Sequence, residues 1–249
     1  MKKYDGWWEG FFPAFRPIFA KVPTRITNAQ VRFISQKLDL RAGRTFLDCP
    51  CGIGRIALPL ARAGVRVTGV DITQSYLDEL ARKVKRLGLK MDLHRQDMRR
   101  INFDSKFDAC GNLWTSFGYF DKESDNMLVL KKMFRALKPG GKFMLHVINR
   151  DWIMVNFQAN EWYQSGDMKV LEDRGFDYAK SISTDVWTFI GPEGSSTHET
   201  AIRMYSYHEL ITMFERVGFV DIEGYGSVKG EPITRNREQM FVIGTRPRR

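Results

Sequence analysis

From Thr45 onward, short apolar runs alternate with longer segments whose apolar residues recur at helical spacing. The runs predicted to be strands are Thr45–Cys49, Val65–Val70, Met91–His94, Phe107–Leu113 and Lys142–Ile148. The last helix between them is expected over Glu123–Leu137, with Pro139-Gly140-Gly141 ending it. Strands that alternate with helices in this way favour a parallel sheet covered on both faces.

The pattern changes after Asn149, and residues 168–205 read as antiparallel strands. Two of these, Asp185–Ile190 and Thr200–Tyr205, are predicted to flank a loop of turn-forming residues, Gly191–Ser196. This stretch predicts a small antiparallel insertion late in the chain.

A helix is then predicted to begin at Ser206, whose hydroxyl forms a capping box with Glu209, and to end at Gly218. Phe219–Tyr225 and Gln239–Thr245 supply two final strands. The expected fold is α/β, with a Rossmann-like doubly wound seven-stranded sheet whose last strand is antiparallel, helices on both faces and the small antiparallel insertion. We expect four regions: a helical lid over 1–42, a cofactor-binding core over 43–150, an antiparallel cap over 151–205, and a helix and strands over 206–249 that complete the core sheet.

Composition supports a folded enzyme-sized domain, because 43% of the 249 residues are hydrophobic. Lys and Arg number 39 against 29 Asp and Glu, a net charge of +10 that is compatible with an anionic partner but does not establish one. The cysteines Cys49, Cys51 and Cys110 lack metal-ligand spacing, so we expect no metal site. With no secretory signal and no apolar run of about 18 residues, we expect a cytoplasmic protein without membrane association.

The segment Phe46–Arg55 places a glycine-rich turn between the first strand and the first core helix. Gly52 and Gly54 allow the backbone to pass close to a ligand, and the first N–H groups of the helix face outward there. Asp71 ends the next strand, where a carboxylate can accept both hydroxyls of a ribose. Asp97 ends the third strand, close to the expected place of an adenine.

These motifs resemble those of the class I S-adenosylmethionine-dependent methyltransferases, in the small-molecule Leu-Asp-x-Pro-Cys-Gly-x-Gly-Arg variant. The glycine loop of that family is similar to Asp48-Cys49-Pro50-Cys51-Gly52-Ile53-Gly54, with proline where the first glycine usually stands. The resemblance continues through four further motifs in the same order along the chain: Val70–Thr73, Gln96–Met98, Asn112–Phe120 and Leu137–Gly141.

The resemblance implies S-adenosylmethionine as cofactor. The residues that it places around this cofactor are Asp48, Pro50, Cys51, Gly52, Gly54, Asp71, Ile72, Asp97, Met98, Asn112 and Leu113. Asp71 would bind the ribose, Asp97 and Met98 would frame the adenine, and Asn112 and Leu113 would lie beside the methionine moiety. An NAD-dependent oxidoreductase is the less favoured alternative, because a carboxylate such as Asp48 beside the turn repels a pyrophosphate and suits an ammonium or sulfonium.

Methyl transfer from a sulfonium is an in-line displacement in which the protein mainly holds the acceptor on axis and away from water. A base is needed only when the acceptor arrives protonated, so the sequence need not display a catalytic residue. Candidates are Tyr119, after the fourth strand, and Arg150 and Asp151, after the fifth. His146 lies inside the fifth strand and is interpreted as a core histidine rather than a base.

The N-terminal segment carries a cluster of aromatic residues: Tyr4, Trp7, Trp8, Phe11, Phe12, Phe15 and Phe19. Their spacing predicts one side of a helix, although Pro13 and Pro17 are expected to break or restart it. Two interpretations are open, a helix packed on the core and a lid whose Tyr4, Trp7 or Trp8 touches the substrate. The other candidate substrate contacts are Trp114, Tyr119 and Trp152.

The favoured acceptor is a small molecule, methylated at nitrogen or oxygen. An RNA acceptor is the main alternative, because eight Lys and Arg residues lie within residues 82–100 and a basic patch can bring nucleic acid to an enzyme. A protein side chain as acceptor and a non-enzymatic cofactor-binding role are further alternatives, and the chain is expected to be a monomer or a homodimer.

Overall fold

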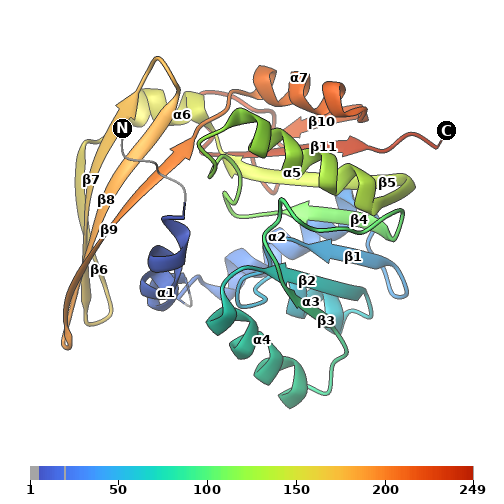
Figure 1. Ribbon diagram of the computed structural model, residues 1–249, viewed down its shortest axis with the longest axis horizontal. Helices are drawn as coiled ribbons and strands as arrows, with labels where there is room; N and C mark the ends of the chain where they lie inside the picture. Colours follow the sequence, from blue (N-terminus) through green and yellow to red (C-terminus); the bar gives the residue numbers. More distant parts are fainter. Residues whose placement is uncertain (1–5, 20, 249) are drawn as a thin grey trace.

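The computed structural model describes residues 6–19 and 21–248. They form two sheets with helices around them (Figure 1). The larger sheet has seven strands in the order β10-β11-β5-β4-β1-β2-β3. Their bounds are β1 (Thr45–Asp48), β2 (Arg66–Asp71), β3 (Asp92–Arg95), β4 (Phe107–Asn112), β5 (Leu137–Ile148), β10 (Val220–Tyr225) and β11 (Gln239–Thr245). Only β11 runs antiparallel to its neighbours β5 and β10, which confirms the expected doubly wound topology.

Successive residues of β1 show why helices cover both faces of this sheet. Phe46 and Leu47 are both fully buried and lie in different apolar clusters. The helices on the Phe46 side are α2 (Thr24–Lys37) and α3 (Ala57–Arg62), with α4 (Gln74–Arg86) beside the edge strand β3. Those on the Leu47 side are α5 (Glu123–Ala136) and α7 (Tyr207–Val217). Within residues 6–19 and 21–248, no helix is long and apolar enough to cross a membrane.

The smaller sheet is antiparallel and stands at one end of the larger one (Figure 1). Its strands follow one another in sequence: β6 (Asn160–Ser165), β7 (Met168–Asp177), β8 (Ile182–Gly191) and β9 (Gly194–Arg203). Helix α6 (Arg150–Asn156) leads into it from β5. The antiparallel insertion is confirmed, although the sequence analysis did not foresee α6 or β6.

The β8–β9 hairpin is tighter than the sequence predicted. The expected loop Gly191–Ser196 is wrong, because Gly191 pairs with Gly194 and only Pro192 and Glu193 lie between the strands. Gly194 has φ +126°, a conformation open to glycine and costly for other residues, so the chain reverses in two residues. The second strand of this hairpin, β9, ends at Arg203 rather than at the predicted Tyr205.

Strand β5 begins five residues earlier than predicted, at Leu137 instead of Lys142. Leu137 pairs with Phe107 and Lys142 with Ala109, so the intervening Pro139-Gly140-Gly141 forms an irregularity inside the strand. The Gly140 N–H donates to the Arg246 carbonyl at 2.8 Å, which provides a backbone partner at the bulge.

Helix α1 (Trp8–Phe19) is continuous, so the expectation that Pro13 and Pro17 break it is wrong. Both prolines are exposed, while Trp8 and Phe11 are only 6% exposed on other sides of the helix. An interior proline costs about 3 kcal/mol in a helix. Burial of the aromatic side chains offsets this cost, since each is worth about 1.5–3 kcal/mol.

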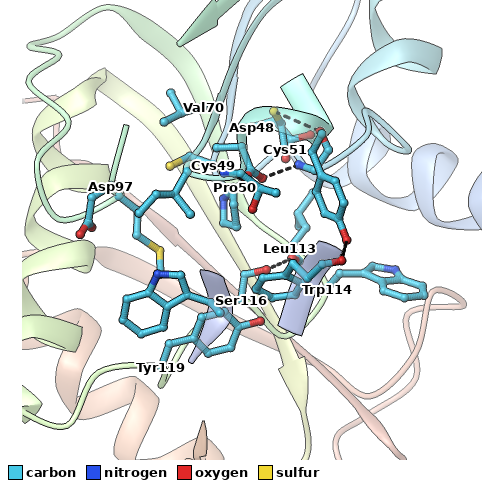
Figure 2. Close-up of a pocket in the computed structure, with 18 of the residues that line it drawn as sticks. Asp48, Cys49, Pro50, Cys51, Val70, Asp97, Leu113, Trp114, Ser116 and Tyr119 are labelled. Carbon is cyan, nitrogen blue, oxygen red and sulfur yellow. Dashed lines mark hydrogen bonds between the residues drawn. The ribbon is translucent and has the colours of Figure 1, made fainter. Parts of the chain in front are cut away.

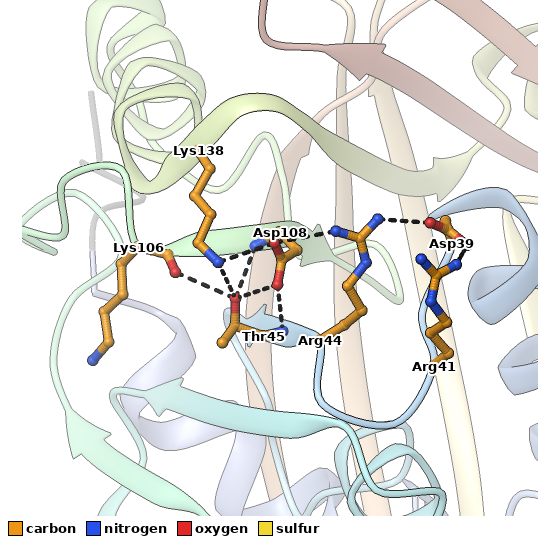
Figure 3. A network of polar contacts seen from close by, with 7 residues as sticks. All are labelled: Asp39, Arg41, Arg44, Thr45, Lys106, Asp108 and Lys138. Atoms are coloured by element: carbon orange, nitrogen blue, oxygen red, sulfur yellow. Dashed lines mark hydrogen bonds and ion pairs between the residues drawn. The ribbon is translucent and has the colours of Figure 1, made fainter. Parts of the chain in front are cut away.

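A polar network joins the starts of β1 and β4, at the opposite end of the sheet from the site described below (Figure 3). The Asp108 carboxylate accepts from the Thr45 N–H and hydroxyl, both at 2.8 Å, and from Lys138 at 3.0 Å. Burial alone would raise the pKa of Asp108, but these bonds lower it to about 2. The network therefore stabilises the fold at neutral pH. Its central carboxylate, Asp108, is partly buried and lies far from the ligand cavity.

Candidate ligand-binding site

A cavity opens at the carboxyl ends of β1, β2 and β4, the place where open parallel sheets bind ligands (Figure 2). Four charged side chains line it: Asp48, Asp71, Asp97 and Arg55. Eight aromatic side chains also line it, four of them from α1: Trp8, Phe12, Phe15, Phe19, Tyr76, Trp114, Tyr119 and Phe120. The cavity therefore combines an acidic floor with an aromatic cover.

The Asp71 carboxylate joins the end of β2 to the glycine turn. Its two oxygens accept from the Gly52 N–H at 2.7 Å and the Thr73 N–H at 2.8 Å. Burial raises the pKa of Asp71, and these backbone bonds offset part of that rise. The carboxylate is thus fixed in direction while it still lines the cavity.

Glycine is required at position 54 by close packing. Gly54 has φ +81°, and an added Cβ would lie 2.3 Å from a Leu80 methyl group on α4. Gly54 does not itself line the cavity, whereas Pro50, Cys51 and Gly52 do. Three residues of the turn, Pro50, Cys51 and Gly52, therefore lie at the cavity. Gly54 leaves the space in which Leu80 of α4 packs against the turn.

Asp48 is a buried acid of the cavity that lacks a hydrogen-bond partner in the described part of the chain. Its side chain is 2% exposed, and no N–H or O–H group of the described residues donates to it. Burial raises the pKa of Asp48 to about 8; Arg55 lowers it and Asp71 raises it further through charge. A cationic ligand group would supply the missing partner.

Asp97 lies at one side of the cavity and Trp114 at the other (Figure 2). Arg99 pairs with Asp97 through NH2 at 2.7 Å, and the Arg99 N–H donates to the other oxygen at 2.8 Å. The same guanidinium lies 4.1 Å from the centre of the Phe120 ring. Arg99 therefore holds the acid and the aromatic wall together.

The loop after β4 has two consecutive residues in the left-handed region, Trp114 with φ 64° and Thr115 with φ 55°. Such backbone is costly for side chains of this size and persists only when the surroundings hold it. His146 provides this support: its Nδ1 accepts from the Trp114 N–H at 3.4 Å and its carbonyl accepts from the Thr115 N–H at 2.9 Å.

His146 is 6% exposed, and its ring stacks on Phe241 with centroids 4.0 Å apart. Burial, with a smaller effect of Arg55, lowers the pKa of His146 to about 3. The ring is therefore neutral at physiological pH, as acceptance at Nδ1 requires. Its burial agrees with the interpretation of a core histidine.

Helix α1 closes the cavity as a cover held at three points. The Tyr76 hydroxyl donates to the Phe12 carbonyl, and Arg16 forms a two-bond ion pair with Glu79, both bonds at 2.8 Å. On its other side, Phe11 packs against Trp187 of the small sheet with centroids 5.4 Å apart. The helix thus lies between the cavity and the second sheet.

Several predicted site residues lie elsewhere. Asn112 is fully buried outside the cavity lining, and its amide contacts the Met98 sulfur at 3.6 Å. Trp7 meets the edge of Tyr119 rather than the cavity, with centroids 4.8 Å apart. The candidates Arg150, Asp151 and Trp152 lie on α6 and do not line the cavity. Tyr4 falls outside the described residues.

The structure brings other predicted residues together at the cavity: Asp48, Pro50, Cys51, Gly52, Asp71, Ile72, Asp97, Met98, Leu113, Trp8, Trp114 and Tyr119. The sequence analysis missed Arg55, Tyr76, Ser116 and Phe120. Arg55 stood at the end of the quoted glycine motif and Phe120 at the end of the motif after β4, so the motifs themselves held that signal. Ser116 lies inside the same motif after β4, whereas Tyr76 gave no comparable signal.

The pair Trp8 and Phe11 allows the cover to be tested. Both side chains are 6% exposed, but only Trp8 lines the cavity. Trp8→Ala and Phe11→Ala should both lower the melting temperature, because removal of a buried aromatic costs about 3–5 kcal/mol. Only Trp8→Ala should also weaken binding of S-adenosylhomocysteine by about tenfold or more, measured by calorimetry well below either melting temperature. Equal losses of affinity in the two variants would show that α1 acts only through packing.

The stretch proposed as a basic patch is partly neutralised. Lys83 pairs with Glu79 at 2.7 Å, Arg99 with Asp97 and Asp125, and Arg95 donates to a backbone carbonyl. No group of three or more His, Cys, Asp or Glu in the described part of the chain is arranged to hold a metal ion.

Comparison with known proteins places this cavity in context. Residues 46–141 match the family described as Methyltransferase domain. Cypemycin N-terminal methyltransferase from Streptomyces sp is 29% identical over 213 residues, which cover 81% of this chain and 82% of that protein.

Solved structures agree over almost the whole chain. An S-adenosylmethionine-dependent methyltransferase from Clostridium acetobutylicum matches with a TM-score of 0.80 at 18% identity, covering 96% of this chain and 99% of that one. The structure of S-adenosylmethionine-bound CalS10, an amino pentose methyltransferase from Micromonospora echinaspora, matches with a TM-score of 0.66 at 18% identity, covering 95% and 96%. At these identities the structural likeness shows a shared fold.

Proposed function

Because this chain is a class I S-adenosylmethionine-dependent methyltransferase, we propose that it methylates the nitrogen of a small-molecule amine. The observation that carries the proposal is the cavity itself, which α1 partly covers and which aromatic and carboxylate side chains line. A concave cavity partly covered by a helix suits a small acceptor better than a polymer. Aromatic faces and carboxylates both attract cations, so they favour an amine.

The described residues fit the cofactor. Asp71 is fixed at the end of β2, where it would accept the ribose hydroxyls, and Asp97 and Met98 lie where an adenine would be framed. The unpartnered Asp48 carboxylate would accept the ammonium of the methionine moiety. When bound, the cofactor supplies a methyl group on a sulfonium, which an amine lone pair can displace in line.

The protein's own contribution is to exclude water and orient the acceptor. Tyr119 is the residue that we place against the acceptor, because its side chain lies between the cofactor region and the aromatic cover. Burial raises the pKa of Tyr119, and a hydrogen bond with Ser116 offsets part of this. The hydroxyl therefore stays protonated and serves as a hydrogen-bonding group rather than as a base.

The names of two relatives support an amine acceptor, although other relatives are named as O-methyltransferases. Cypemycin N-terminal methyltransferase and the amino pentose methyltransferase CalS10 are both described as acting at amino-bearing molecules. An RNA acceptor has less support, because part of the basic stretch is paired within the protein.

The proposal is tested by a turnover screen with S-adenosylmethionine and panels of amines, amino sugars, phenols and bulk tRNA. Methylation should appear in the amine or amino-sugar panels, with formation of S-adenosylhomocysteine as the readout. The Tyr119→Phe variant should raise KM or lower kcat for the accepted amine by about tenfold, while its affinity for S-adenosylhomocysteine stays unchanged. Turnover confined to phenols or tRNA would overturn the amine assignment.

A further inference from the structure

We propose that Arg55 binds the carboxylate of the cofactor's amino-acid end, and that Gln30 of α2 positions Arg55 for this role. The inference rests on the cofactor placement proposed above and adds a recognition element to it. Three observations carry it: a buried guanidinium with an unpartnered donor, its rigid fixation at the cavity wall, and its place beside Asp48.

The first observation is the state of the guanidinium. Arg55 lines the cavity, and its Nε is buried without any hydrogen-bond partner among the described residues. No carboxylate of those residues forms an ion pair with it, and Asp48 acts on it through charge alone. A cation removed from water without a hydrogen-bonded counter-charge has an unfavourable desolvation free energy. An anionic ligand group that binds Arg55 would offset this free energy.

The second observation is that the guanidinium cannot swing away. Its NH1 donates to Gln30 Oε1 at 2.6 Å and to the Thr27 hydroxyl at 3.1 Å, both on α2. Its plane lies over the Trp114 ring, with Cζ 4.0 Å from the ring centre. Gln30 is 2% exposed, and its Oε1 also accepts from the Trp114 Nε1 at 3.1 Å.

Gln30 therefore fixes the cation and the aromatic ring with a single oxygen. The Gln30 amide oxygen accepts from Nη1 of Arg55 and from the Trp114 indole. The Nη2 group of Arg55 has no hydrogen bond to a described residue and, unlike Nε, is not buried, so it is the donor available to a ligand. A guanidinium is well suited to this task because its fork of N–H donors matches the geometry of a carboxylate.

The third observation is charge complementarity. The Arg55 guanidinium and the Asp48 carboxyl group line the same cavity without a hydrogen bond between them. The amino-acid end of the cofactor carries an ammonium and a carboxylate. Asp48 would face the ammonium and ionise beside it, and the Arg55 cation would face the carboxylate.

Two ligands separate this role from general effects on the site. S-adenosylhomocysteine carries the amino-acid end, whereas 5′-methylthioadenosine has the same nucleoside and thioether without it. Calorimetry should show that Arg55→Met weakens S-adenosylhomocysteine by about 10- to 100-fold, as expected for a lost hydrogen bond to a charged group. Binding of 5′-methylthioadenosine should change by less than about threefold, which also verifies that the variant is folded.

Three further variants complete the test. Arg55→Lys, which keeps the charge and loses the fork, should recover part of the preference for S-adenosylhomocysteine. Gln30→Leu should lower the ratio of the affinity for S-adenosylhomocysteine to that for 5′-methylthioadenosine by about threefold or more. A general loss of stability would weaken both ligands and leave this ratio unchanged. Arg62→Met, at an exposed arginine of α3 outside the cavity, is the matched control and should leave both affinities unchanged.

Equal losses for the two ligands in Arg55→Met, or no loss for either, would overturn the assignment. If the wild-type protein binds neither ligand, the cofactor placement itself fails, which is a different result. If the wild-type protein binds both ligands with equal affinity, no group reads the amino-acid end and the proposal is also overturned.

Discussion

Asp71→Ala is expected to reduce the affinity for S-adenosylhomocysteine by at least about 100-fold, the largest effect of any single substitution in the cavity. The carboxylate has two tasks, because it would bind the ribose hydroxyls and it holds the Gly52 and Thr73 N–H groups in place. Each lost charged hydrogen bond is worth about 1.5–3 kcal/mol, so the ligand loses its ribose contacts together with the shape of the turn. Calorimetry measures the affinity, and thermal melting measures the accompanying loss of stability.

Asp108→Asn is the matched control for this experiment. Asp108 is also a poorly exposed carboxylate that accepts hydrogen bonds from backbone and side-chain donors. It lies near the amino end of β4, whereas the cavity lies at the carboxyl ends of the strands. This variant should lower the melting temperature and leave the affinity unchanged. If Asp71→Ala binds S-adenosylhomocysteine as well as the wild type does, the site assignment is wrong, whatever happens to its stability.

The residues placed around the cofactor could be predicted because each is marked by residue types within a short stretch of sequence. Asp71 follows directly from the end of a predicted strand, and the glycine turn follows from the residue types at positions 52 and 54. In a parallel sheet the carboxyl ends of neighbouring strands meet at one edge, so separate motifs converge without knowledge of tertiary contacts.

The cover and the positioning groups were not predictable in this way. Gln30 lies 84 residues from Trp114 in the chain and its bond to the indole exists only in the folded protein. The helical region predicted over 1–42 contains α2 but gave no separate bounds for it, and α1 was expected to break at its prolines. In both helices, contacts with distant segments outweigh local preference, such as the packing of Phe11 on Trp187.

The strained loop after β4 connects these long-range contacts to the chemistry. Trp114 is held on one side by His146 of β5 and on the other by Gln30 of α2, so two elements from different parts of the chain fix one residue. The arrangement places the Arg55 guanidinium against the same ring. The geometry at the amino-acid end of the cofactor is therefore tied to the loop that carries Tyr119.

The affinity for S-adenosylhomocysteine is expected to rise with pH between about 6 and 8. In the free protein, burial raises the pKa of Asp48 to about 8, so its carboxyl is mostly protonated at pH 7. The bound ammonium favours the ionised form, which lowers this pKa in the complex. Binding therefore releases a proton, and the affinity gains up to about tenfold per pH unit until the free carboxyl ionises near pH 8.

The proton release can be measured directly by calorimetry at pH 7 in two buffers that differ in ionisation enthalpy. The wild type should release close to one proton per ligand bound. In Asp48→Asn, an amide of the same size removes the titrating group, so the release should fall toward zero and the affinity at pH 8 should drop by about tenfold or more. The 5′-methylthioadenosine control has no ammonium and should bind the wild type without this release, because nothing in that ligand draws the proton from Asp48. A wild-type affinity for S-adenosylhomocysteine that stays constant from pH 6 to 8 would show that the carboxyl is already ionised before the ligand arrives.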